Sequence, residues 1–72
     1  MTKSTEDLIR IAAAGGGFTI DGRNFTTDNL VRIAAAASEK GSRIHIQNAD
    51  TRNTEDLIRI GAAGKGFVTL DL

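Results

Sequence analysis

Hydrophobic and polar positions repeat three times along this chain, in two alternating patterns. The first is an amphipathic run with apolar residues at helical spacing, which begins at Thr5, Thr27 and Thr54. The second is a short alternating run, over residues 18–21, 44–47 and 67–70. Because a period near 3.6 residues indicates a helix and a period of two indicates a strand, the chain predicts three helix–strand units in series.

The three helical segments match at nearly every position without a gap. They are residues 5–12, 27–34 and 54–61. In the first, Leu8, Ile9 and Ile11 fall on one side with Ala12, and Arg10 falls opposite them. The residues directly before these segments have side chains typical of helix N-caps, and they are Ser4, Thr26 and Asn53. Each segment therefore predicts a capped helix with one inner face.

Each predicted helix also contains an acidic residue four positions before an arginine. The pairs are Glu6–Arg10, Asp28–Arg32 and Glu55–Arg59. An ion pair at this spacing within one helix adds about 0.2–0.5 kcal/mol. We therefore expect solvated helix faces with intrahelical ion pairs, in preference to a ladder of arginines that binds anions.

Small residues follow each amphipathic run. The alanines of 12–14 and 34–37 would let a helix lie close to its sheet. The glycines that we expect to end the helices and reverse the chain are Gly15–Gly17, Gly41, Gly64 and Gly66.

This pattern predicts an α/β fold of the order α-β-α-β-α-β in one domain, residues 1–72, with repeats at about 4–24, 25–51 and 52–72. Strands joined by helical crossovers are parallel, so we expect a three-stranded parallel sheet. A strand order of 1-2-3 would put the helices on one face, as in a short two-layer solenoid, whereas 2-1-3 would put them on both. The regularity of the repeat favours 1-2-3.

Alternation within the strands predicts one buried side and one open side of the sheet. The residues expected to face the helices are Phe18, Ile20, Ile44, Ile46, Val68, Leu70 and Leu72. The residues expected on the open side are Thr19, Asp21, Arg43, His45, Gln47, Thr69 and Asp71. Phe67 does not fit this register and either caps the core or is exposed. Since parallel sheets are normally covered on both faces, we expect a second copy to cover an edge or the open face.

Composition narrows the function classes. The 72 residues include no cysteine, one histidine and three phenylalanines, with nine basic and nine acidic residues. We therefore expect no metal or other cofactor, no nucleic-acid partner and no membrane partner, since these need ligands, excess positive charge, stacking rings or long apolar runs. A cytoplasmic location is the expectation in the absence of a signal-peptide pattern.

Two groups of polar residues could form a site. On the open side of the sheet, His45 would lie in a row with Thr19 and Thr69, beside a second row of Asp21, Gln47 and Asp71. A histidine between carboxylates could be a general base or a weak metal site, but these residue types are also ordinary on the solvent side of a sheet. The other group lies in the loops after the strands, where ligands bind in open α/β sheets: Arg23, Asn24, Asn48, Asp50 and Arg52. Arginines beside helix N-termini could hold a small anion, but the same residue types are also common in turns and caps.

The segments 25–37 and 53–60 resemble small, uncharacterised bacterial α/β-repeat proteins, and the resemblance extends over nearly the whole chain. In organisation the chain is also similar to short leucine-rich solenoids, although it lacks their Leu-x-x-Leu-x-Leu signature. The resemblance implies a fold and assigns no activity.

The sequence thus favours a non-enzymatic protein-interaction or structural module with no catalytic residues, acting through an exposed sheet face or edge on a protein partner or a second copy. The alternative is a binder of a small anionic ligand at the strand-end loops. A small hydrolase centred on His45 is the third and least favoured hypothesis.

Overall fold

The computed structural model describes residues 4–72 and confirms the predicted α/β order. Its main elements are helices α1 (Thr5–Ala13), α2 (Thr27–Lys40) and α3 (Thr54–Gly64), and strands β1 (Phe18–Asp21), β2 (Ile44–Gln47) and β3 (Val68–Leu70). Two short 3-10 helices, η1 (Gly22–Asn24) and η2 (Ala49–Thr51), follow β1 and β2. Each repeat is therefore one helix and one strand, joined to the next repeat by a short turn.

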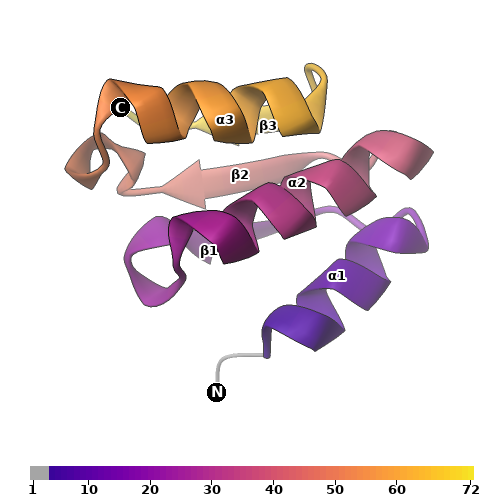
Figure 1. Ribbon diagram of the computed structural model, residues 1–72. Helices are drawn as coiled ribbons and strands as arrows, with labels where there is room; N and C mark the ends of the chain where they lie inside the picture. The colour runs from indigo at the N-terminus through magenta and orange to yellow at the C-terminus, as the bar shows by residue number, and fades with distance from the viewer. Residues whose placement is uncertain (1–3) are drawn as a thin grey trace.

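The sheet is parallel throughout and its strand order is β1-β2-β3. All three helices lie side by side over the same face of the sheet, which leaves the other face open (Figure 1). The order favoured by the regular repeat is thus confirmed, and the 2-1-3 alternative is not found. The main packing contacts join neighbours only, α1 with α2 and α2 with α3.

The helix starts are those predicted from the sequence. The side chains of Ser4, Thr26 and Asn53 accept hydrogen bonds from backbone N–H groups three residues later, at 3.2, 3.2 and 2.8 Å. Each bond satisfies one of the N–H groups that have no partner inside a helix. The caps therefore fix where each amphipathic run begins.

The helices end at the predicted glycines. Gly15 and Gly41 adopt positive φ angles of 102° and 71° beyond α1 and α2. In the third repeat α3 ends at Gly64, and the residues with positive φ angles that follow are Lys65 at 49° and Gly66 at 90°. Gly64 has another reason to be glycine: a Cβ there would lie 2.4 Å from Cγ2 of Val68.

The core lies between the helices and the sheet. Its buried apolar residues are Leu8, Ala12, Leu30, Ile33, Ala34, Ala37, Ile44, Ile46, Ala49 and Ile60. Three of them are helical alanines, which confirms that small side chains allow close packing. Ser42 is buried with them and donates a hydrogen bond of 2.7 Å to the carbonyl of Ala12, which joins the second repeat to the first.

Two predictions at the margins of the core need correction, and the open alternative for Phe67 is decided. Leu72 was expected to face the helices but is 73% exposed, because β3 ends at Leu70. Ile11 is predicted on the inner face but is 39% exposed, because within residues 4–72 no helix packs on this side of α1. Phe67 precedes β3 and is half-buried with its ring edge toward Gly41, so it caps one end of the core.

The predicted ion pairs within helices are also wrong. Arg32 in α2 pairs with Glu6 in α1 at 2.8 Å, and Arg59 in α3 pairs with Asp28 in α2 at 3.0 Å. Neighbouring helices pack so closely that each arginine reaches the acid of the preceding repeat. No helix in the described part of the chain is long and apolar enough to span a membrane.

Candidate functional site

The open face of the sheet gathers the polar residues that the alternation predicted. The register places Thr19, His45 and Thr69 in one row across the three strands, and Asp21 beside Gln47 in another. Asp71 lies just beyond β3, where its N–H donates to the carbonyl of Ile46 at 3.0 Å. Arg43 is exposed immediately before β2. The register thus places five of the seven expected residues on one face, and Arg43 and Asp71 lie just outside the strands.

This surface offers little support for acid–base chemistry. His45 is only half-buried, and both its neighbours in the row are threonines. Its imidazole makes no hydrogen bond to any side chain within residues 4–72. A catalytic histidine usually has a nucleophile on one side and an orienting carboxylate on the other. The row Thr19–His45–Thr69 lacks the second of these.

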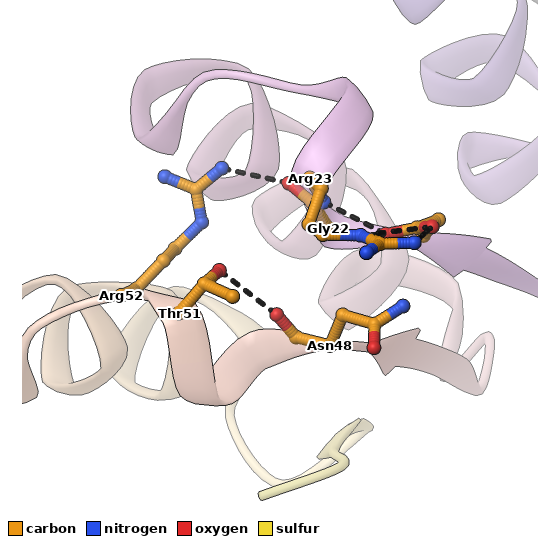
Figure 2. A network of polar contacts seen from close by, with 6 residues as sticks. Gly22, Arg23, Asn48, Thr51 and Arg52 are labelled. Carbon is orange, nitrogen blue, oxygen red and sulfur yellow. Dashed lines mark hydrogen bonds and ion pairs between the residues drawn. The ribbon is translucent and has the colours of Figure 1, made fainter.

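The strand-end loops bring the other predicted residues together, since η1 and η2 lie side by side (Figure 2). Arg23 already has a partner there: its Nη2 lies 2.9 Å from the carboxylate of Asp21, which also accepts from the Arg23 backbone N–H at 2.9 Å. These hydrogen bonds hold the pKa of Asp21 well below its usual range, and they raise that of Arg23. The positive charge of Arg23 is therefore matched within its own turn.

Arg52 is used in a different way. Its Nη2 donates to the carbonyl of Gly22 at 2.8 Å and also to that of Phe25, while Nη1 donates to the hydroxyl of Thr27 (Figure 2 shows the bond to Gly22). Its Nε is buried and has no hydrogen-bond partner within residues 4–72. The guanidinium thus closes the turn around η1 and fastens the third repeat to the second.

The remaining predicted loop residues shape the turns. Asn48 adopts a left-handed conformation with φ 58°, and its carbonyl accepts a hydrogen bond of 3.0 Å from the hydroxyl of Thr51 (Figure 2). Asn24 and Asp50 are exposed. The structure therefore brings the five predicted residues to one rim, but both of its arginines point into contacts of the fold.

The surfaces that sequence reasoning missed are the two ends of the repeat stack. Ile11 on α1 is 39% exposed and Ile58 on α3 is 57% exposed. A hollow of about 460 Å³ lies along the outer side of α1, with lining residues Asp7, Arg10, Ile11 and Ala14. On the outer side of α3 the exposed residues are Thr54, Glu55, Ile58 and Ala62. The place of each repeat in the series could have indicated these surfaces, because the first and last repeats of a solenoid each lack one neighbour.

Comparisons with protein-family models, with curated proteins and with solved structures found no match for this chain. The resemblance to bacterial α/β-repeat proteins therefore stays a prediction. Within residues 4–72, no three histidine, cysteine or acidic side chains are grouped so that they could hold a metal ion.

Proposed function

We propose that this protein is a non-enzymatic interaction module that binds a protein partner through the two ends of its repeat stack. The observation that carries this proposal is a difference in burial between equivalent positions. Ile33 and Ile60 are completely buried by the preceding repeat, whereas Ile11 at the same position of the first repeat is exposed. The ends thus present a surface that the fold covers everywhere else.

The free energy of burying apolar side chains also supports binding at the two ends of the stack. Fully burying an isoleucine side chain is worth about 1.5–3 kcal/mol relative to leaving it in water. Repeat proteins usually carry terminal repeats with polar outer faces, which keep the stack from extending. Here the outer faces carry Ile11 and Ile58, and within residues 4–72 no strand pairs with the outer edge of β1 or of β3. Such edges readily accept another strand.

The other hypotheses have weaker support. A binder of small anions would need arginines that can reach a ligand, and Arg23 and Arg52 already bind Asp21 and backbone carbonyls. The capping side chains of Thr26 and Asn53 each already accept from one of the backbone N–H groups at the helix N-termini beside these loops. A hydrolase would need a second catalytic group beside His45.

Site-specific photo-crosslinking tests the proposal. A photoreactive amino acid is introduced singly at Ile11, at Ile58, and at two exposed control positions, Thr69 on the open sheet face and Glu39 near the end of α2. The chains are then irradiated in an extract of cells that express the protein. We expect protein adducts from positions 11 and 58 and few from 39 and 69. Adducts confined to position 69 would overturn the proposal in favour of the sheet face.

A further inference from the structure

We infer that the partner of both ends is a second copy of this chain, stacked head to tail, so that α1 of one copy lies against α3 of the next. This inference rests on the proposed function, because it names the occupant of the same end surfaces. It follows from the way in which neighbouring repeats already contact one another inside the molecule.

The ion pairs give the interface a direction. Arg32 donates to Glu6 and Arg59 donates to Asp28, so each arginine binds the acid of the repeat before it. At each end of the series one residue of this kind has no partner. Arg10 on α1 is equivalent to Arg32, and Glu55 on α3 is equivalent to Glu6 and Asp28. Neither Arg10 nor Glu55 forms an ion pair with any side chain of residues 4–72. A copy placed before α1 would bring its Glu55 to Arg10 at the position that Glu6 occupies relative to Arg32.

A second polar contact joins α2 to α3. The hydroxyl of Thr27 on α2 donates to the carboxylate of Asp56 on α3 at 3.1 Å. The equivalent residues at the two ends are Thr54 on the outer side of α3 and Asp7 on the outer side of α1. Head-to-tail stacking therefore brings a second complementary donor and acceptor together, beside the first ion pair.

The apolar groups at the two ends are complementary in position. Ile9 and Val31 are half-buried and pack against the core, whereas the equivalent Ile58 is 57% exposed because no helix follows α3. The hollow on α1 is lined by Ile11 and Ala14, on the side where a preceding helix would lie. Ile58 of one copy fits this hollow of the next, as an apolar centre surrounded by the polar pairs.

The sheet can continue across the same junction. In the molecule each strand pairs in parallel with the strand of the next repeat, Phe18 beside Ile44 and Ile44 beside Val68. The outer edge of β3 in one copy and that of β1 in the next are both unpaired, and stacking of the helices brings them together. Contacts of this kind use different surfaces on the two partners, so they form chains or closed rings in place of simple twofold dimers.

Two variants that each block one end test this arrangement. The head-blocked variant carries Arg10→Glu and Ala14→Glu, and the tail-blocked variant carries Glu55→Arg and Ile58→Asp; all four positions are exposed. Sedimentation should show the wild-type mass rising with concentration over roughly two decades. Each variant alone should stay monomeric, because a like-charge contact weakens association by roughly tenfold or more. An equal mixture of the two should form a 1:1 dimer through the unblocked tail and head.

The control variant Glu39→Arg reverses an exposed charge away from both ends and should associate like the wild type. Circular dichroism of every variant checks that it is folded. A monomeric wild type, variants that still associate alone, or a mixture without dimers would overturn head-to-tail stacking. If crosslinks from positions 11 and 58 then identify a different protein, the proposed function stands without it; crosslinks from position 69 alone would remove both.

Discussion

The middle repeat and the two end repeats have nearly the same helix sequence but very different surroundings. Leu30 and Ile33 of α2 are completely buried, because α1 lies on one side of them and α3 on the other. In α1 the equivalent of Ile33 is exposed, and in α3 the exposed residue is Ile58. The comparison teaches that the repeated residues build an interface on each side of a repeat, and that the ends differ only in having one side unoccupied.

The test with the largest expected effect replaces the isoleucines at the same position of the first and second repeats. Ile33→Ala removes a fully buried side chain and should lower the free energy of unfolding by about 2–5 kcal/mol. Ile11→Ala removes a side chain that is 39% exposed and should cost less than half as much. Chemical denaturation of dilute protein, where association is absent, measures both. Equal losses would show that the first repeat is covered in solution even at low concentration.

The second test concerns the two loop arginines. Arg52 joins the third repeat to the middle one through Gly22, Phe25 and Thr27, so Arg52→Ala should lower the free energy of unfolding by about 1.5–3 kcal/mol. Arg23 binds only Asp21 in its own turn and is well exposed, so Arg23→Ala should have a much smaller effect. Thermal denaturation of the two variants and the wild type measures both losses of stability. The reverse ranking would argue that Arg52 is held in place for a ligand.

A third test uses two glycines in α3 that face opposite surroundings. At Gly64 an added Cβ would lie 2.4 Å from Val68, so Gly64→Ala should lower stability by about 1–3 kcal/mol. At Gly61 nothing lies within 4 Å, so Gly61→Ala should raise stability by about 0.5–1 kcal/mol through better helix propensity. The midpoints of denaturant unfolding show whether each substitution stabilises or destabilises the protein. A destabilising Gly61→Ala would indicate that a neighbour covers this side of α3.

The smallest expected effect is at the turn after β1. Asp21 caps η1 and binds Arg23, so the pKa of Asp21 is lowered on folding. The equivalent turn after β2 differs, because the side chain of Asn48 makes no capping hydrogen bond to η2. A carboxylate with a lowered pKa stabilises the fold above the usual aspartate pKa of about 3.9, and this contribution is lost as the pH falls further. The difference between the denaturant midpoints at neutral pH and pH 3 should therefore shrink in Asp21→Asn.

Much of the fold could be predicted because local signals agree at each repeat. The caps at Ser4, Thr26 and Asn53, the apolar spacing and the alternation in the strands all indicate the same elements. The repeat regularity then favoured the order β1-β2-β3. These features depend on residues close together in the chain, which is why the sequence alone reveals them.

The errors arose where a residue chooses between a near partner and a distant one. Arg32 lies one turn from Asp28, yet it pairs with Glu6 because α1 and α2 are in close contact. The contacts of Arg52 with the carbonyls of Gly22 and Phe25 could not be predicted, because these residues are far away in sequence. Exposure of Ile11 and Ile58 depends in the same way on which helices are neighbours. Such contacts are properties of the packed repeats, so no local pattern contains them.

Because repeats contact only their neighbours, the middle repeat also has a special place in folding. A strand pair and a helix pair form when α2 and β2 meet either neighbour. Folding of a repeat array can start at any repeat and spread to its neighbours. The middle repeat is the one element that can start this process from either side, so folding should begin there and spread outward, with the end repeats docking last and opening first.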